Sequence, residues 1–327
     1  YLKSEQYAMP VFYHDVMYRE NTEEKDAAFL KLYDGHDWKW FAVRLKHTDM
    51  EYLRKHWSGK KASAPTLEKK HDKYFLRFTY AEEVALNRTP VKEQTICSVD
   101  LGINTDAVCT IMRPDGTILG RKFINFPSDK DRMYRVLGRI RRFQREHGSR
   151  QVQGRWAYAK RLNTELGKKI AREIVFYASE NRADVIVFEY LEMKGKLSGK
   201  KKQKLQMWRK RDIQKRCGQQ AHRKGIRISR ICAWNTSRLA FDGSGKVDRD
   251  IQDHRLCTFQ NGKRYHCDLS ASYNIGARYF IREILKPLPA TERSLLEAKV
   301  PAVKRRTSCV YADLRDLISE MELRKAA

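Results

Sequence analysis

The chain has 327 residues, enough for two domains or for one domain with insertions. Its 67 Lys and Arg residues against 40 Asp and Glu residues give a formal net charge of +27, which favours a polyanion, above all nucleic acid, as the partner. The sequence contains no run of 18 apolar residues and no signal-peptide pattern, which excludes a membrane span and predicts a cytoplasmic protein. Its seven cysteines lack a framework pattern, so we expect reduced thiols.

Residues 1–92 are predicted to form a β-rich unit. Four stretches are rich in aromatic and β-branched residues, as strands are: 9–13, 28–33, 38–45 and 74–80. Lysines and aromatic residues alternate on several of them, which suits a β-barrel that grips a nucleic-acid backbone and stacks its bases. The alternative is an ordinary barrel core with a solvated basic face.

Residues 93–234 are predicted to form the first part of an α/β domain. Three strands follow one another within 95–126, with a turn at Pro114-Asp-Gly116 before the third. A long basic helical region then covers 129–181, and Gly148 divides it into two helices.

A strongly basic stretch continues this domain. We predict a strand over 184–189, a helix over 206–224 and a strand over 226–231. From 190 to 230, fifteen Lys or Arg residues stand against two acids, which favours a face that contacts phosphates, although such a run is also typical of a solvated surface. The residues that we expect to bind nucleic acid are Arg139, Arg142, Lys168, Arg172, Lys204, Arg209, Arg211, Lys215 and Arg238.

Three acids stand at the ends of predicted elements. Asp100 ends an alternating apolar stretch, Glu189 ends another, and Asp268 opens an amphipathic stretch. Taken singly, each acid is more simply a turn or cap residue. Together they could converge, and because a buried trio of like charges is costly without a cation, we expect them to bind magnesium. Two such ions can drive hydrolysis of a phosphodiester.

The order of the elements predicts an α/β fold of the RNase H-like kind. Three strands, helices, two further strands, an insertion and a last helix would give a mixed sheet with flanking helices. The insertion covers 235–267, the last helix 268–286, and a tail of mixed character 287–327, helical near its end. Asn274, within the last helix, is a weaker candidate for supporting the acids.

Four short segments share a recognisable pattern. They are Ser98-Val-Asp-Leu-Gly-Ile-Asn104, Val185-Ile-Val-Phe-Glu-Tyr-Leu191, Asn235-Thr-Ser237 and Asp268-Leu-Ser-Ala-Ser-Tyr-Asn-Ile275. This pattern resembles the RuvC nuclease motifs of transposon-encoded TnpB proteins, and equally those of the compact type V CRISPR effectors. The resemblance covers about residues 60–285, and Ser270 stands where the family commonly has Asn.

The resemblance implies an RNA-guided DNA endonuclease, a hydrolase acting on phosphodiester bonds. Asp100, Glu189 and Asp268 would be its catalytic acids and would hold two Mg²⁺ ions. Residues 1–92 would be part of the wedge, an oligonucleotide-binding (OB-like) barrel that holds the guide RNA. The partners would be guide RNA and target double-stranded DNA, in the cytoplasm of a bacterium and associated with its nucleoid. The motifs do not separate a transposon protein from a CRISPR effector.

The insertion departs from the family pattern. Members often carry a zinc ribbon there, built from two Cys-x-x-Cys pairs. Here Ala240 and Gly243 stand where the first pair would fall, and Cys257 is followed by Thr-Phe-Gln, so we expect no zinc. The insertion 235–267 would still be the lobe that binds target nucleic acid, folded without metal. Its candidates for contact with a scissile phosphate are Arg238, Arg249 and Arg255.

Two other functions stay open on the sequence. One is an RNA-guided regulator that binds DNA without cutting it, which the loss of one acid would favour. The other is an unguided RNase H-like nuclease or transposase, against which the basic, aromatic unit ahead of the acids argues.

Overall fold

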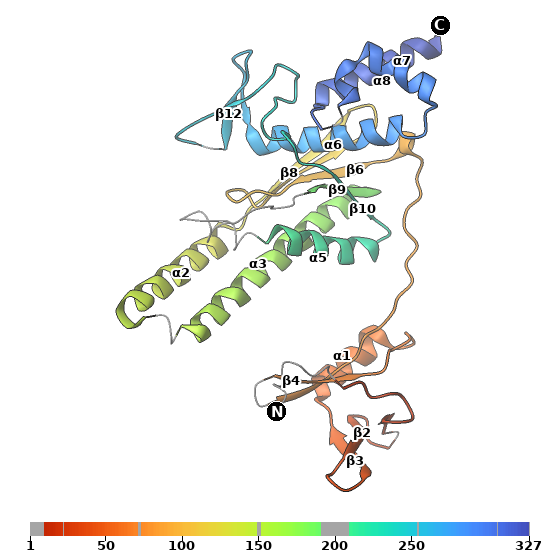
Figure 1. The fold of residues 1–327 in the computed structure, drawn as a ribbon, viewed down its shortest axis with the longest axis vertical. Helices are drawn as coiled ribbons and strands as arrows, with labels where there is room; N and C mark the ends of the chain where they lie inside the picture. Colours follow the sequence, from red (N-terminus) through yellow and green to blue (C-terminus); the bar gives the residue numbers. More distant parts are fainter. Residues whose placement is uncertain are drawn as a thin grey trace. The chain divides into compact units, whose positions relative to one another are not determined.

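The chain divides into two compact units, residues 1–83 and 84–327. The computed structural model describes residues 10–21, 23–70, 73–148, 152–190, 209–253, 255–305 and 307–326 (Figure 1). In this described part of the chain, no helix combines the length and the apolar character that crossing a membrane requires.

The first unit contains two small antiparallel sheets. Its elements are β1 (Tyr18–Glu20), β2 (Ala27–Tyr33), β3 (Trp38–Arg44), α1 (His47–Trp57), β4 (Thr66–Lys70) and β5 (Lys73–Arg77). The sheets have the strand orders β1-β2-β3 and β4-β5, and side chains from both pack into one core around Phe12 and Tyr18. Among the residues described here, no pairing of named strands joins the two sheets, so closure into a barrel stays a prediction.

The sequence patterns of this unit predict its longer strands better than its other parts. Strands form where 28–33, 38–45 and the start of 74–80 predict them. The stretch 9–13 was predicted wrongly: in its described part, Val11 makes a single bridge to Thr66. The helix α1 was not predicted, because it buries none of its residues and so has no apolar stripe. Its residues His47 and Arg54 pair with Asp26, which directly precedes β2.

A five-stranded mixed sheet organises the second unit. Its strands are β6 (Ile96–Asp100), β7 (Ala107–Met112), β8 (Ile118–Ile124), β9 (Val185–Tyr190) and β10 (Arg227–Cys232). They lie in the order β10-β9-β6-β7-β8. The strands β10, β9 and β6 run parallel, whereas β7 and β8 join as an antiparallel meander. The predicted mixed sheet is therefore confirmed.

Alternation along the strands divides the side chains of this sheet between two cores. In β6, Ile96 belongs to one core, while Cys97 and Val99 belong to the other. In β9, Val187 and Phe188 divide in the same way. Successive side chains of a strand point to opposite faces, so each face has its own set of helices.

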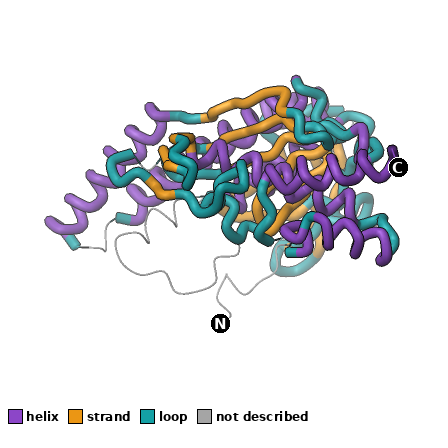
Figure 2. Tube along the Cα trace, turned by 90° about the horizontal axis from the view of Figure 1, so that it is seen from above, coloured by secondary structure: helices purple, strands orange, loops and turns teal. Residues whose placement is uncertain are grey.

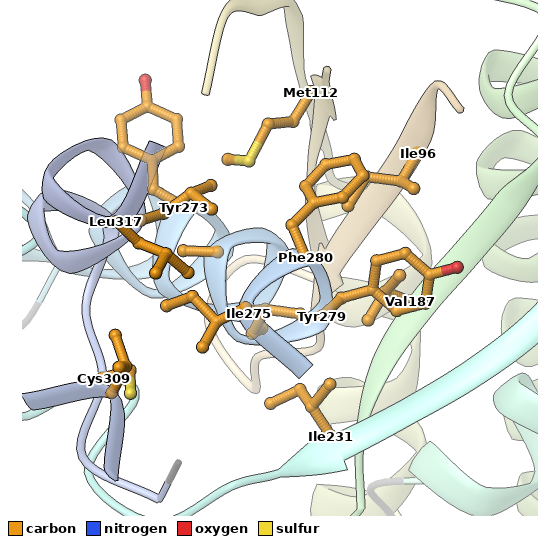
Figure 3. Packing of buried hydrophobic residues seen from close by; sticks show 14 of the residues in the cluster. Ile96, Met112, Val187, Ile231, Tyr273, Ile275, Tyr279, Phe280, Cys309 and Leu317 are labelled. Carbon is orange, nitrogen blue, oxygen red and sulfur yellow. The ribbon is translucent and has the colours of Figure 1, made fainter. Parts of the chain in front are cut away.

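One face is covered by a helix that is buried along almost its whole length. The elements on this side are α6 (Cys267–Leu285), α7 (Ala290–Lys299), η3 (Pro301–Lys304) and α8 (Tyr311–Ala326). Figure 3 shows side chains of α6, among them Phe280 and Tyr279, facing the strand residues Ile96 and Val187. A Cβ added at Gly276 would lie 2.9 Å from the Met112 side chain, so glycine there permits a close approach of helix to sheet.

The opposite face is covered by two helices that expose one side to solvent. The helices of this region are α2 (Pro127–His147), α3 (Gln153–Glu180) and α5 (Lys210–His222). Both α3 and α5 pack on the sheet, while α2 packs on α3 through Met133, Ile140 and Ala159 (Figures 1 and 2). The helical region predicted over 129–181 is present, and Gly148 ends its first helix with a positive φ of 71°.

The insertion forms a small sheet with its own core. Its strands are β11 (Asp248–Arg249), β12 (Leu256–Thr258) and β13 (Arg264–His266), which pair antiparallel in that order. Ala240, Cys257, Phe259 and Cys267 are buried together beneath it. A short helical turn, η2 (Val91–Glu93), precedes β6 elsewhere in the unit.

Candidate functional site

Strand alternation and register bring two of the predicted acids together. Asp100 ends β6 and Glu189 is the second-last residue of β9. Val99 pairs with Phe188 in the parallel register, so Asp100 and Glu189 come next on adjacent strands. Both acids fall on the same face as Ile96, which is the face that α6 covers. The side chains are 9% and 8% exposed, respectively.

The third acid comes from the first turn of α6. Asp268 is half-buried, and its Oδ2 lies 3.6 Å from the point where a Cβ at Gly102 would be. Gly102 belongs to the loop that follows Asp100, so the absence of a side chain there leaves room for Asp268 beside the end of β6.

Burial and electrostatic repulsion shift the pKa values of the three carboxyl groups. Burial raises the pKa of Asp100, and the negative charges of Glu189 and Asp268 raise it further. Burial also raises the pKa values of Glu189 and Asp268. The site therefore disfavours three simultaneous negative charges unless a cation compensates them.

Neighbouring side chains fix the orientation of the acids. The Thr236 hydroxyl donates a hydrogen bond to Glu189 Oε1, and Gln214 Nε2 donates one to the Glu189 carbonyl oxygen at 3.0 Å. A hydrogen bond from Thr105 lowers the pKa of Asp268 against the effect of its burial. These polar partners give no periodic signal in the sequence, although Thr236 lies in one of the motifs noted above.

Asn274 holds the segment that carries Thr236. Its side-chain amide donates to the carbonyl oxygens of Thr236 at 3.0 Å and Leu239 at 2.9 Å, and its oxygen accepts the Tyr311 N–H at 3.0 Å. All these contacts are to backbone groups, so Asn274 fixes the turn after β10 rather than facing the carboxylates.

The structure distinguishes among the three arginines of the insertion. Burial raises the pKa values of Asp100 and Asp268, and the positive charge of Arg249 offsets part of that rise. Arg255 is instead paired with Asp253 at 2.8 Å, and no such effect on the acids marks Arg238, although Arg238 and Arg249 are both exposed. The sequence could not predict this difference, because all three arginines lie in the same short insertion.

The donor atoms suit a hard divalent cation. Among the described residues, no three His, Cys, Asp or Glu side chains surround a single point closely enough to hold one metal ion. Magnesium, however, is commonly held by one or two carboxylates and completes its shell with water and phosphate oxygens. Asp100 and Glu189, which follow paired residues on adjacent strands, are the carboxylates that would hold such an ion, with Asp268 on their side of the sheet.

The predicted nucleic-acid contacts lie mostly on exposed helix surfaces. Arg139 and Arg142 are exposed on α2, and Lys168 and Arg172 on α3. On α5, Arg211 and Lys215 are exposed, while Arg209, at the N-cap, is half-buried and lies 3.4 Å from Asp212. Lys204 lies outside the described residues.

A cavity of about 480 Å³ separates these helices from the loop after Asp100. Apolar side chains of α2, α3 and α5 line part of it, and the loop residues Gly102, Ile103 and Asn104 line another part. Tyr134, 72% exposed, and Arg141 stand at this cavity, with the guanidinium 6.0 Å from the ring centre. Nothing in the sequence pattern distinguishes Tyr134.

Comparisons with known proteins give a fold. No protein family and no curated protein matches the chain. Among solved structures, the chain is similar to the mini-RNA-guided endonuclease CRISPR-Cas_phi3, with 13% identity over 76% of this chain and 57% of that one and a TM-score of 0.50. It is also similar to Cas12f1 in a complex with single-guide RNA and target DNA, with 17% identity over 64% of this chain and 55% of that one and a TM-score of 0.46.

A further similar structure is C2c1 of Alicyclobacillus acidoterrestris in complex with single-guide RNA, with 11% identity over 77% of this chain and 43% of that one and a TM-score of 0.42. The chain thus spans about half the length of the solved structures that it matches. The likeness to the structure with a TM-score of 0.50, at 13% identity, shows a shared mixed α/β fold and no more.

Proposed function

We propose that this chain is the nuclease-bearing part of an RNA-guided DNA endonuclease. The observation that carries the proposal is that Asp100 and Glu189 end adjacent parallel strands on one face, while Asp268 begins the helix α6 that covers this face and lies beside Gly102 of the loop after Asp100. Like charges buried close together are costly, so such an arrangement favours a bound cation. The mixed sheet, with acids on its first and fourth strands and on the helix α6, supports an RNase H-like fold of the RuvC type.

The reaction would be hydrolysis of a phosphodiester. When bound, magnesium supplies a nucleophilic water and neutralises charge on the leaving oxygen. Asp100, Glu189 and Asp268 would be the residues that hold the metal. Thr236 and Gln214 hold Glu189 in place and so reduce the reorganisation that metal binding would otherwise require.

Arg249 would act on the substrate. Its positive charge offsets part of the rise in the pKa values of Asp100 and Asp268, and an exposed guanidinium on this side of the insertion would bind a non-bridging oxygen of the scissile phosphate. There it would neutralise the charge that grows on the phosphate as the water attacks.

Guide RNA and target double-stranded DNA are the partners that we propose. A net charge of +27 suits two polyanions, and two of the similar solved structures are named as complexes with single-guide RNA, one of them also with target DNA. Exposed cations of α2, α3 and α5 would contact the backbones. The first unit, with its aromatic and basic strands, would hold the guide RNA.

To test this function, the protein is expressed from its native locus, with the DNA that flanks its gene, and is then purified. Bound RNA is extracted and sequenced, and matching DNA is then supplied with Mg²⁺ to the wild type and to Asp100→Ala. A defined RNA together with cleavage that the variant lacks is the expected result. A defined RNA without cleavage would indicate a regulator, and the absence of any discrete RNA would overturn the guided function.

A further inference from the structure

A second cavity is lined by the turn after β10 and by residues of the insertion. It has a volume of about 510 Å³ and lies between the turn that follows β10 and the strand β11. One of its walls is the indole of Trp234, which is 67% exposed. Because an indole this exposed contributes little of the stabilisation that burial would give, its exposure points to a ligand that covers it.

Three cations line the same cavity: Arg238, Lys246 and Arg249. In the part of the chain that the structure describes, neither the Arg238 guanidinium nor the Lys246 ammonium group is hydrogen-bonded or ion-paired to another residue, and both are accessible from the cavity. Asp248 is the one acid among the residues of the wall. An aromatic face beside unpaired cations is the pair of features that a nucleotide requires for its base and its phosphate.

Hydrogen bonds from α6 fix the backbone of the segment that carries Trp234. Buried Arg278 of α6 donates hydrogen bonds to the carbonyl oxygens of Cys232 at 2.9 Å and Trp234 at 2.7 Å. Asn235 follows with a positive φ of 60°, which turns the chain sharply. Since the backbone is fixed on both sides of the turn, the indole is presented without a large loss of backbone entropy on binding.

The turn after β10 connects this cavity with the acids. Trp234 lines the cavity, and Thr236, within the same turn, donates a hydrogen bond to Glu189. A phosphate bound at the acids would therefore have its neighbouring nucleotide on the side of Trp234.

We propose that this cavity binds one unpaired nucleotide of the strand that is cut, next to the scissile phosphate. Its base stacks on Trp234, and Arg238 and Lys246 hold the phosphate on its far side. The base must be unpaired, because in a duplex the adjacent base pairs cover both of its faces. This inference rests on the proposed function, since it assumes that the acids act on a nucleic-acid strand. Stacking accepts every base, so the cavity selects single-strandedness more than sequence.

The test measures binding, so that it does not depend on cleavage. The full-length protein, freed of nucleic acid and carrying Asp100→Ala, is mixed with single-stranded DNA that contains 5-iododeoxyuridine at one position, and irradiated. We expect a crosslink that maps to Trp234 by mass spectrometry. Lys246→Ala should lower the yield of this crosslink about fivefold, as expected for the loss of one phosphate contact.

Substitution of the indole gives the second readout. In the same Asp100→Ala background, Trp234→Ala should weaken binding of a short single strand about 5- to 100-fold, because a stacked base contributes about 1–3 kcal/mol. Trp234→Phe should restore most of the affinity. Phe176→Ala is the matched control, since it removes an exposed aromatic ring from a cavity that shares no residue with this one.

The outcomes separate this inference from the proposed function. Crosslinks that map elsewhere, with equal affinity for Trp234→Ala and its parent, would overturn the nucleotide cavity even if the wild type cuts DNA. A crosslink at Trp234 together with an inert wild type would support the cavity and count against the nuclease. If Trp234→Ala fails to fold, the crosslink yields of Lys246→Ala and Arg238→Ala decide, and unchanged yields in both would overturn the inference.

Discussion

The two faces of the central sheet differ in what covers them. On one face, α6 is buried along nearly its whole length between the strands and the C-terminal helices. On the other, α3 and α5 bury one side and expose basic residues on the other. The acids belong to the first face, and most of the proposed nucleic-acid contacts belong to helices of the second. The proposed reactive groups thus belong to the more completely packed face, whereas the proposed polyanion contacts lie on exposed helix surfaces.

The largest effect that we expect comes from the acid in the middle of the trio. Asp100→Asn should lower the rate of metal-dependent cleavage at least about a thousandfold, because it removes a negatively charged ligand at the reacting centre. The folded protein should unfold at an equal or higher temperature in EDTA, because a repulsive charge is gone. Single-turnover cleavage and thermal unfolding measure the two effects.

The matched control for this variant is Asp316→Asn on exposed α8 surface. It should change neither the cleavage rate nor, by more than about 0.5 kcal/mol, the free energy of unfolding. An Asp100→Asn protein that cuts as fast as this control would show that the acids are not the reactive centre.

The second prediction compares the packing on the two faces. Phe280 on α6 is fully buried, whereas Phe176 on α3 is 49% exposed. Phe280→Ala should lower the free energy of unfolding by about 3–5 kcal/mol, because it leaves a cavity between helix and sheet. Phe176→Ala should cost well under half as much, and urea unfolding of both variants measures the difference. Equal losses would contradict the account of α6 as the more completely packed helix.

The third prediction concerns the charge that the insertion brings to the acids. Arg249→Ala should lower the cleavage rate about a hundredfold, because a donor to the growing phosphate charge is lost. Arg255→Ala, whose partner is Asp253, should have little effect on the rate. If Arg255→Ala lost more cleavage activity than Arg249→Ala, the phosphate contact would belong to Arg255, and the role proposed for Arg249 would be wrong.

The smallest effect that we expect is a pH dependence from α8. Burial raises the pKa of Asp313, although its carboxylate accepts the Val310 N–H at 2.7 Å. The folded pKa lies above the unfolded one, so the contribution of this group to stability is full below the unfolded pKa and is lost as the pH rises through the folded pKa. Asp313→Asn should therefore flatten the fall of the unfolding temperature between acid and neutral pH, and an unchanged profile would count against the burial of this carboxyl.

The elements that the sequence predicts are those with a repeating pattern. Alternating apolar residues locate β6, β7 and β9, and helical spacing locates α3 and α6, so the positions of Asp100, Glu189 and Asp268 on their elements follow from the chain. The patterns place Asp100 and Glu189 at strand ends and Asp268 at a helix start, whereas the adjacency of the two strands comes only with the fold.

What the sequence leaves undecided depends on contacts between distant segments. The choice of Arg249 among three arginines, the hydrogen bond from Thr236 to Glu189 and the exposure of Trp234 all arise from the way the insertion folds over α6. Single polar or aromatic residues in short irregular segments have no periodicity, so composition gives them no distinguishing mark. The helix α1 could not be predicted for a related reason: it buries no residue, so its sequence has no apolar residues at helical spacing.

The most direct test of the central claim is the effect of Mg²⁺ on thermal unfolding of the wild type and of Asp100→Asn, Glu189→Gln and Asp268→Asn at pH 7.5. If the three carboxylates form one cation site, Mg²⁺ should raise the unfolding temperature of the wild type relative to EDTA, because it binds only the folded state. Each variant should show a smaller rise. An equal rise in all four proteins would mean that the ion binds elsewhere and would contradict the claim that these acids form a metal-dependent centre.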